Sequence, residues 1–246
     1  MRVAVAGGTG LTGRHLVTAL AAAGHEPVVL ARSRGVDLVA GTGIEQALDG
    51  VETVIDVTDR KTVRRAGATA FFESAGRHLL AAERRAGVRH HVALSIVGID
   101  RVDLGYYAGK RRQEELVRAG EVPWTVLRTT QFHEFAERFL AAPGPLAVAP
   151  RMLSQPIAVR EVAAALAALV DGPPQGMAAE LAGPREEQMV DAVRRLARAR
   201  GRRCLVLPLR MPGAAGRPMA SGSLLPTGPG PRGTQTFDQW LAEQRG

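Results

Sequence analysis

The chain of 246 residues has a single cysteine, Cys204, only two lysines and two tyrosines, and no asparagine. A lone cysteine excludes an internal disulfide, and the surrounding sequence RRCLVLPL predicts a buried strand position with a structural role. No uninterrupted run of about 18 apolar residues occurs, so a membrane-spanning helix is not expected. The first residues, MRVAVAGGTG, also lack the charged and apolar regions of a secretory signal. We therefore expect a cytoplasmic protein with no membrane partner.

The formal net charge is +8, and almost all of the positive charge comes from arginine. The arginines are scattered along helical patterns with Glu and Asp among them, and no basic block with interleaved aromatic residues is present. The abundance of Ala, Arg, Gly and Pro indicates a GC-rich bacterial genome. We interpret most of the charge as codon bias on a solvated surface and do not expect nucleic acid as a partner.

Short apolar segments alternate with longer helical patterns along the first half of the chain. Segments rich in Val, Ile and Leu, typical of strands buried on both faces, occupy residues 2–7, 26–32, 52–58, 89–98 and 123–130. Helical patterns lie between them, at 12–24, 44–50, 68–87 and 106–120. The alternation predicts an α/β fold, a Rossmann-type doubly wound parallel sheet. We expect one domain, with a core at 1–132 and a smaller part at 133–246.

The second half has a looser pattern. Helices are expected at 131–142, 160–172, 186–201 and 234–244, and short strands at 155–159, 179–183 and 204–209. The last helix has Thr234 or Thr236 as its N-cap. The segment 211–233 is dense in Gly, Pro and Ser, which predicts a loop over a pocket.

A glycine-rich segment connects the first expected strand to the first helix. Gly7, Gly10 and Gly13 give a GxxGxxG spacing, which allows a tight turn and a close approach of backbone N–H groups to a pyrophosphate at the helix N-terminus. Strand, glycine triplet, helix and second strand together predict a dinucleotide site. The cofactor contacts expected in this loop are Gly7, Thr9, Gly10, Leu11, Thr12 and Gly13.

The end of the second strand distinguishes NAD from NADP. An NAD site needs an acid there for the ribose 2′-hydroxyl, whereas this chain has LARSRG. Arg32, with Ser33 and Arg34 beside it, is suited to bind a 2′-phosphate, so the expected cofactor is NADP. Arg14 is a weaker candidate for a ligand of that phosphate. Further expected cofactor contacts at the ends of later strands are Val57, Thr58 and Thr129.

Several motifs resemble one known family. GGTGLTG, LSIVGID, YYAGK and VLRTTQFHEF, followed by AVREVAAAL and ELAGP, are similar to the NmrA-like, atypical branch of the short-chain dehydrogenase/reductase superfamily. The resemblance implies a Rossmann fold and a nicotinamide cofactor over most of the chain. It leaves activity open, because that branch includes NADP sensors without catalysis as well as reductases. Two features depart from relatives: the chain has no Asn for the proton relay, and Thr42 stands where an Asp near the adenine is usual.

The residues themselves are consistent with a reductase. Tyr106 and Lys110 are four residues apart, so on a helix they share one face. The Lys110 ammonium would stabilise a phenolate and also bond the nicotinamide ribose, while Ser95, at the end of a strand, would bond a carbonyl oxygen that Tyr106 protonates. Tyr107 with Arg111 is the alternative register. Without Asn, the relay would use water or His133.

The remaining candidates concern substrate and metal. His133, together with Gln131 and Phe132, follows the fifth strand and is a candidate for substrate contact. His90 and His91 lack a second pair at metal-ligand spacing, so we interpret them as structural and expect no metal. The sequence thus predicts an NADPH-dependent oxidoreductase acting on a carbonyl or conjugated small molecule, as a monomer or homodimer. An NADP-binding sensor and a non-redox isomerase, cyclase or dehydratase remain alternatives.

Overall fold

The computed structural model describes residues 1–60, 62 and 64–244. Two compact units can be distinguished, and they interleave along the chain. Unit 1 contains residues 1–95, 104–128 and 160–178, and unit 2 contains residues 96–103, 129–159 and 179–246. We describe each unit separately.

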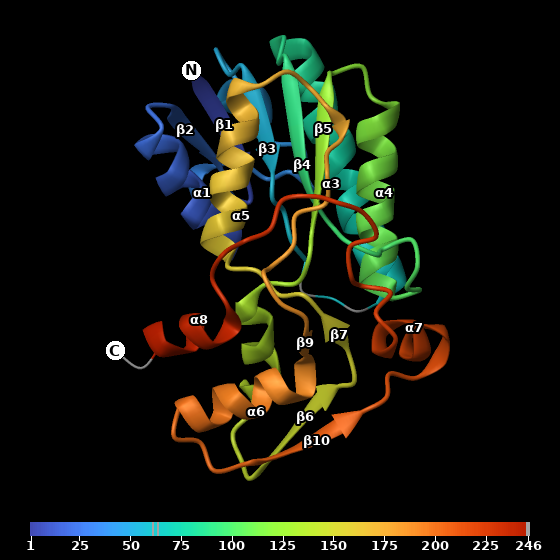
Figure 1. Cartoon of the computed structure of the whole chain (residues 1–246). Coiled ribbons are helices and arrows are strands. Elements are labelled where there is room, and N and C mark those ends of the chain that lie inside the picture. The colour runs from blue at the N-terminus through green and yellow to red at the C-terminus, as the bar shows by residue number, and fades with distance from the viewer. Residues whose placement is uncertain (61, 63, 245–246) are drawn as a thin grey trace. The chain divides into compact units, whose positions relative to one another are not determined.

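A six-stranded sheet forms the centre of unit 1, in the order β2-β1-β3-β4-β5-β8 (Figure 1). Its strands are β1 (Arg2–Ala6), β2 (Glu26–Leu30), β3 (Thr53–Asp56), β4 (His90–Ile96), β5 (Trp124–Thr129) and β8 (Gly176–Met177), of which β4 and β5 run on into unit 2 by one residue each. β1 pairs in parallel with both β2 and β3, so the chain reverses its direction of progress across the sheet at β1. The expected Rossmann-type, doubly wound fold is confirmed, and the carboxyl end of β1 is the switch point at which such sheets bind ligands.

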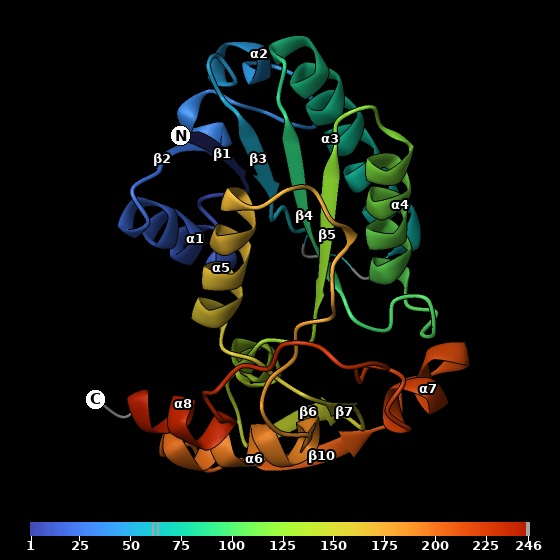
Figure 2. The same ribbon diagram turned by 45° about the horizontal axis from the view of Figure 1, so that its top comes forward.

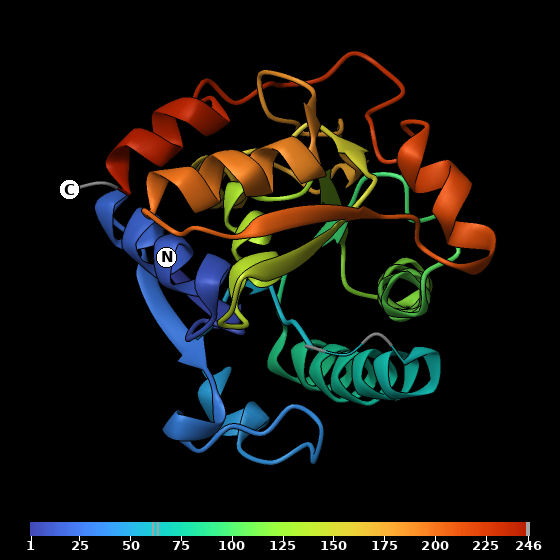
Figure 3. The same cartoon turned by 90° about the horizontal axis from the view of Figure 1, so that it is seen from below.

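The helices of unit 1 cover both faces of this sheet. They are α1 (Leu11–Ala22), the 3₁₀ helix η1 (Arg32–Arg34), α2 (Ile44–Ala47), α3 (Arg65–Ala86), α4 (Gly105–Ala119), α5 (Val159–Ala168) and the 3₁₀ helix η3 (Leu169–Asp171). α5 crosses in front of the sheet in Figure 1, whereas α3 and α4 lie side by side on the other face, as Figures 2 and 3 also show. One part of the core lies between β1, β3 and α3 and includes Ala4, Val54 and Leu79, each at most 1% exposed. Burial of a valine or leucine side chain such as Val54 or Leu79 contributes about 1.5–3 kcal/mol.

Unit 2 consists of small elements. β6 (Leu146–Pro150) pairs in parallel with β10 (Leu205–Leu209), and β7 (Leu153–Ser154) pairs with β9 (Glu187–Gln188) in the antiparallel sense. The amphipathic helix α6 (Met189–Ala199) lies against β6 and β10 (Figure 3). The other helices are the 3₁₀ helices η2 (His133–Leu140) and η4 (Gly213–Ala215) and the helices α7 (Gly216–Ala220) and α8 (Phe237–Glu243).

Several sequence expectations for the second half are settled by these elements. Of the two expected N-cap candidates, Thr236 precedes α8, and its side chain accepts a hydrogen bond from the N–H of Gln239 in a capping box. The helix expected at 131–142 is a shorter 3₁₀ helix, and the strands expected at 155–159 and 179–183 are reduced to isolated bridges. The prediction of a buried Cys204 is wrong: this residue precedes β10 and is half-buried, whereas Val206 is the buried residue of that strand.

None of the helices in the described ranges has the length and apolar character needed to cross a membrane.

Candidate functional site

The glycine loop between β1 and α1 is a tight turn in which side chains have no room. Gly7 has φ +83°, and its N–H donates to the carbonyl of Leu30 at the end of β2 (3.3 Å). A Cβ on Gly7 would lie 2.9 Å from the carbonyl oxygen of Val57, and one on Gly13 only 2.2 Å from that of Gly7. Backbone therefore packs directly on backbone around this turn, and glycine is required at both positions.

The start of α1 offers hydrogen-bond donors that the helix itself cannot use. Gly10 is the N-cap residue, no side chain of the described residues caps the helix, and its first turn contains no acid. The N–H groups of Leu11, Thr12 and Gly13 accordingly lack intrahelical acceptors. Leu11 is 40% exposed, an unusual position for a large aliphatic side chain. These features fit a bound pyrophosphate, with the helix dipole favouring its negative charge.

The segment after β2 carries the residues expected to read the cofactor ribose. Arg32, Ser33 and Arg34 form η1 and are all exposed. The nearby carboxylate of Asp37 accepts hydrogen bonds from the N–H groups of Val39 (2.8 Å) and Ala40 (3.1 Å). The bonds from Ala40 and Val39 hold the pKa of Asp37 below its ordinary value, with a smaller contribution from the charge of Arg32.

Two other residues near the loop were singled out by the sequence. The guanidinium of Arg14 donates to the carbonyl of Thr9 (3.0 Å), so its side chain folds back over the glycine loop. Thr42 forms an antiparallel bridge with Asp37 through backbone hydrogen bonds of 3.0 and 3.1 Å. An acidic residue, Asp37, therefore lies opposite Thr42 in this bridge.

The end of β3 packs against the first glycine. Val57 and Thr58 are buried, and the N–H of Thr58 donates to Oδ1 of Asp56 (2.9 Å). The Oγ1 atom of Thr58 is buried and has no hydrogen-bond partner within the described part of the chain. A buried hydroxyl left in this condition is uncommon, and a ligand at the switch point would satisfy it.

The three proposed catalytic residues all belong to unit 1. Ser95 lies near the end of β4 and is 2% exposed; its Oγ atom, like that of Thr58, has no hydrogen-bond partner among the described residues. In the first turn of α4, Tyr106 is half-buried and its hydroxyl donates to Oδ1 of Asp59 (2.6 Å). Tyr107 is buried, with 6% of its surface exposed. The two neighbouring phenols therefore have different surroundings, and Tyr106 is the one whose hydroxyl lies beside the residues that follow β3.

Lys110 is held by a chain of buried polar groups. Its ammonium donates to the carbonyl oxygen of Leu94 (2.6 Å) and to Oε1 of Gln113 (2.5 Å), and the amide nitrogen of Gln113 donates to Oδ2 of Asp56 (2.6 Å). Burial lowers the pKa of Lys110 below its ordinary value, while the negative charges of Asp56, Asp59 and Glu114 oppose that shift. The ammonium also lies 5.0 Å from the ring centroid of Phe72.

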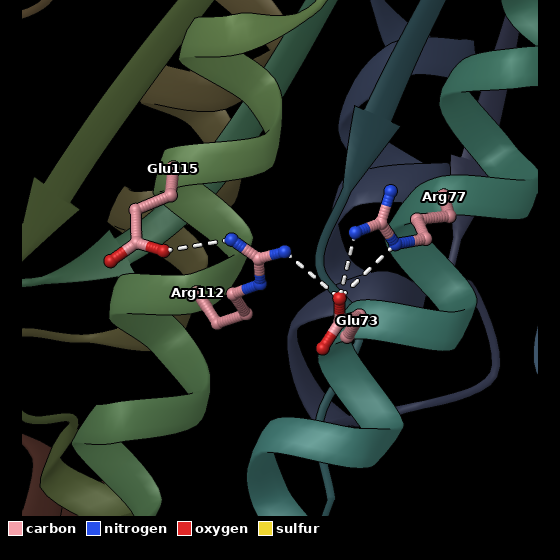
Figure 4. Close-up of polar contacts among 4 residues, drawn as sticks. All are labelled: Glu73, Arg77, Arg112 and Glu115. Atoms are coloured by element: carbon pink, nitrogen blue, oxygen red, sulfur yellow. Dashed lines mark hydrogen bonds and ion pairs between the residues drawn. The ribbon is translucent and has the colours of Figure 1, made fainter.

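Close packing and ion pairs fix the helix that carries these residues. A Cβ on Gly109 would lie 2.7 Å from the ring of Phe72 on α3, so α3 and α4 approach closely at this point. Farther along both helices, the carboxylate of Glu73 accepts hydrogen bonds from Arg112 (2.8 Å) and Arg77 (2.9 Å), as Figure 4 shows. These hydrogen bonds lower the pKa of Glu73, and the bond from Arg112 has the larger effect.

A buried ion pair connects α4 to β5. Arg128 donates to both carboxylate oxygens of Glu114, at 2.9 and 2.6 Å, and the two side chains are largely buried. The bidentate geometry restricts the rotation of α4 relative to the strand. The face of α4 that carries Tyr106 and Lys110 is thereby set.

The expected contacts at the end of β5 and just after it belong to unit 2. Thr129 is buried, and its carbonyl accepts the N–H of Val97 (2.9 Å). Phe132 is half-buried and forms a bridge with Ile157. The side-chain amide of Gln131 is buried with neither its nitrogen nor its oxygen hydrogen-bonded in the described ranges, which leaves it available to a ligand.

His133 has a different environment. A ring nitrogen lies 3.0 Å from the carbonyl oxygen of Gln235, and the ring packs against Phe237 and Trp240, with centroids 5.6 and 5.9 Å away. The residue is 1% exposed. These contacts with the C-terminal helix give His133 a packing role within unit 2.

His90 and His91 are both buried at the start of β4. His90 lies 2.8 Å from the hydroxyl of Thr125, and Nδ1 of His91 lies 2.9 Å from both carboxylate oxygens of Glu83. The described residues contain no group of three or more His, Cys, Asp or Glu side chains arranged to hold a metal.

The sequence reasoning overlooked three residues of this site: Asp56, Asp59 and Gln113. Asp59 directly follows the expected third strand (52–58), and Gln113 lies three residues after Lys110, on the same face of the helix. The positions of Asp59 and Gln113 could therefore have been recognised from the sequence. The contact between Gln113 and Asp56, however, joins residues 57 apart and requires the folded chain.

The chain is similar to known nicotinamide-dependent proteins. A family model described as NAD(P)H-binding matches residues 7–173. The (4-alkanoyl-5-oxo-2,5-dihydrofuran-3-yl)methyl phosphate reductase of Streptomyces griseus is 32% identical over 221 residues, which cover 81% of this chain and 74% of that protein. The ceramide reductase of Caulobacter vibrioides is 33% identical over 141 residues, covering 51% of this chain and 44% of that protein.

Solved structures show the same fold at lower identity. UDP-glucose 4-epimerase of Thermus thermophilus in complex with NAD gives a TM-score of 0.71 at 21% identity, covering 99% of this chain and 93% of that one. The NADPH-dependent quinone oxidoreductase of Escherichia coli in complex with NADPH gives 0.71 at 17% identity, covering 98% and 99%. The chain therefore belongs to the NAD(P)H-binding family.

Proposed function

We propose that the protein is an NADPH-dependent reductase of a small molecule that contains a carbonyl group or a double bond conjugated with one. The observation that carries this proposal is the group of polar side chains at the carboxyl edge of the sheet in unit 1. Ser95 presents a buried hydroxyl without a hydrogen-bond partner in the described chain. Tyr106 and Lys110 share a face of α4, and the Lys110 ammonium donates to the carbonyl of Leu94, the residue before Ser95. The similarity to a reductase of an alkanoyl-substituted oxo-dihydrofuran supports the same reaction class.

Each residue has a role in this proposal. The bound cofactor supplies hydride to the substrate. Ser95 donates a hydrogen bond to the carbonyl oxygen, and Tyr106 gives it a proton. The positive charge of Lys110 lowers the cost of the phenolate that remains. The carboxylate of Asp59, which accepts the hydrogen bond of Tyr106, would take a proton from water and pass it to the phenolate.

The preference for NADP rests on η1. Arg32 is exposed, has no ion pair in the described part of the chain, and follows the strand that ends beside Gly7. Replacing Arg32 with Ala should weaken NADPH binding about 10- to 100-fold, the scale of one charge-assisted hydrogen bond, and should barely change NADH binding. Calorimetric titration of both cofactors measures this. Arg118→Ala, which removes an exposed arginine on α4, is the control, and equal affinity of the unmodified protein for NADPH and NADH would contradict the proposal.

Turnover is tested with Ser95→Ala. Because Ser95 Oγ has no partner within the described residues, the change should leave stability unaltered, while NADPH oxidation with a panel of aldehydes, ketones and enones should fall about 10-fold or more. Ser154→Ala is a matched control, since this serine is equally buried and its hydroxyl is also without a hydrogen bond in the described ranges. Tight NADPH binding without oxidation by any substrate of the panel would favour the sensor interpretation instead.

A further inference from the structure

A cavity of about 910 Å³ lies within unit 2, and its lining includes none of the residues assigned so far. It is formed where α6, the ends of β6 and β10, η4 and α7 meet, elements that can be followed in Figure 1. Four arginines line it, namely Arg151, Arg194, Arg210 and Arg217, against a single carboxylate, that of Asp191. The volume is at the upper end of the range of small-molecule sites, roughly 300–1,000 Å³.

The positive charge in this cavity is not neutralised by the protein. Arg194 donates to Oδ1 of Asp191 (3.0 Å), so the carboxylate that lines the cavity is already paired with one of the four arginines. The guanidinium groups of Arg151, Arg210 and Arg217 have no carboxylate or hydrogen-bond partner among the residues that the structure describes. Like charges gathered around one cavity repel each other and destabilise the folded state, and an anionic ligand would remove that cost.

Backbone contacts fix the positions of the chain segments that carry these arginines. Leu209 and Pro150 are partners in the parallel register of β10 and β6, so Arg210 and Arg151 follow paired positions, and the N–H of Arg151 donates to the carbonyl of Leu209 (2.8 Å). Arg217 follows Gly216, where a Cβ would lie 2.0 Å from the carbonyl oxygen of Met211. Arg151 and Arg210 therefore lie side by side just beyond the two strands, and Arg217 lies in the first turn of α7, after a position that only glycine fits. All three residues are exposed.

The chemistry of the lining defines the ligand. Guanidinium groups offer planar pairs of N–H donors that match the oxygens of carboxylates and phosphates. A phosphate monoester, with nearly two negative charges and three acceptor oxygens, can bond more of these arginines than a carboxylate can. Val190, Pro208 and Met211 add apolar surface beside the arginines, and the volume exceeds what a free phosphate ion fills. We propose that this cavity binds a small organic phosphate, with the phosphate on Arg151, Arg210 and Arg217 and the organic part on the apolar lining.

Titration with phenyl phosphate tests the site. It is performed at low ionic strength, because salt screens exposed charges, and with NADPH present in excess, so that the glycine loop is not available to the probe. Wild-type protein should bind phenyl phosphate more tightly than inorganic phosphate and should not bind phenol measurably. Arg210→Gln and Arg217→Gln should each weaken phenyl phosphate binding about 10-fold, the effect of one lost charge-assisted bond.

Arg198→Gln is the matched control, since Arg198 is an exposed arginine one turn beyond Arg194 on α6 and outside the cavity. It should bind phenyl phosphate as the wild type does. The thermal midpoints of the cavity variants, measured without ligand, should equal or exceed that of the wild type, because each change removes a repelling charge. No binding of phenyl phosphate by the wild type, binding of phenol at equal strength, or equal weakening by Arg198→Gln would overturn the proposal.

Discussion

The hydroxyl of Tyr106 donates a hydrogen bond of 2.6 Å to Asp59, a residue 47 positions earlier in the chain. This contact gives the phenol an acidic neighbour in a protein that has no asparagine for a proton relay. It also distinguishes Tyr106 from Tyr107, which is buried beside it.

Tyr106→Phe retains the ring and its edge-on packing against Phe72 but removes the transferable proton. We expect turnover to fall by roughly 10²- to 10⁴-fold, the range of general acid catalysis, with NADPH affinity nearly unchanged. Steady-state kinetics and cofactor titration measure the two effects. Tyr107→Phe is the control, and a larger loss in that variant would assign the role to Tyr107.

Asp59→Asn tests the relay. The amide keeps the size of the side chain and still accepts the hydrogen bond of Tyr106, but it cannot carry a proton. Turnover should fall by less than in Tyr106→Phe, and its dependence on pH should change. If the kinetics and their pH profile stay as in the wild type, Asp59 has no part in proton return.

Gln113→Leu removes the amide that lies between Lys110 and Asp56. One donor of the buried ammonium and one oxygen of Asp56 would lose their partners, at a cost of about 1–3 kcal/mol in the free energy of unfolding. Turnover should fall as well, and its pH profile should shift, because the surroundings of Lys110 change. Urea unfolding and kinetics provide the measurements; Gln46→Leu, an exposed position on α2, should alter neither.

Gly10→Val and Gly13→Ala separate binding from folding. At Gly10 a Cβ would approach the carbonyl oxygen of Gly7 only to 3.2 Å and the backbone φ is −74°, so valine should fold there yet displace the pyrophosphate. At Gly13 even a methyl group would lie 2.2 Å from that oxygen. We therefore expect Gly10→Val to lose NADPH binding with little change in thermal midpoint, and Gly13→Ala to lower the midpoint too. Retained NADPH binding in a folded Gly10→Val protein would mean that the loop is only a structural turn.

The buried pair His91 and Glu83 predicts a pH-dependent stability. Burial alone lowers the pKa of His91, but the charge and hydrogen bond of Glu83, with a contribution from Asp56, raise it above the ordinary value. Burial raises the pKa of Glu83, and burial, together with the charge of His91, lowers the pKa of neighbouring His90. The stability that His91 contributes is therefore complete below its unfolded-state pKa, about 6.5, and is lost as pH rises through the higher folded-state value.

His91→Leu measures this contribution. Breaking a buried ion pair costs about 3–5 kcal/mol, so the variant should be less stable than the wild type by an amount of this order at about pH 6. The difference should shrink as the pH rises, when His91 of the wild type loses its proton. Urea titrations across this pH range measure the difference in free energy of unfolding, with His15→Leu as an exposed control. A difference that stays constant or grows with pH would contradict the prediction.

The sequence was sufficient for the fold because its signals are local. The glycine spacing at Gly7, Gly10 and Gly13 and the alternation of apolar segments with helical patterns depend on neighbours within a turn or a strand, and the sheet follows from them. The N-cap at Thr236 is local in the same sense. The prediction for Cys204 was wrong because the apolar segment RRCLVLPL does not indicate where its strand begins. The strand β10 begins at Leu205, one residue after the cysteine.

Features that depend on distant contacts could not be predicted. The ring of His133 packs against a helix about a hundred residues later, bonding to Gln235 at a separation of 102, and so the histidine that the sequence offered as a substrate contact has a packing environment. The arginine cavity likewise assembles side chains from positions 151 to 217. Along the chain these arginines are indistinguishable from those on solvated helices.

The division into two units has a practical consequence for following their unfolding. The chain has two tryptophans: Trp124 opens β5 in unit 1, and Trp240 lies buried in α8 of unit 2, stacked near His133. Each unit thus carries its own intrinsic fluorophore. Replacing one tryptophan at a time with phenylalanine makes the emission of the other a reporter of a single unit, so that denaturant can show whether the two units lose their structure together or in succession.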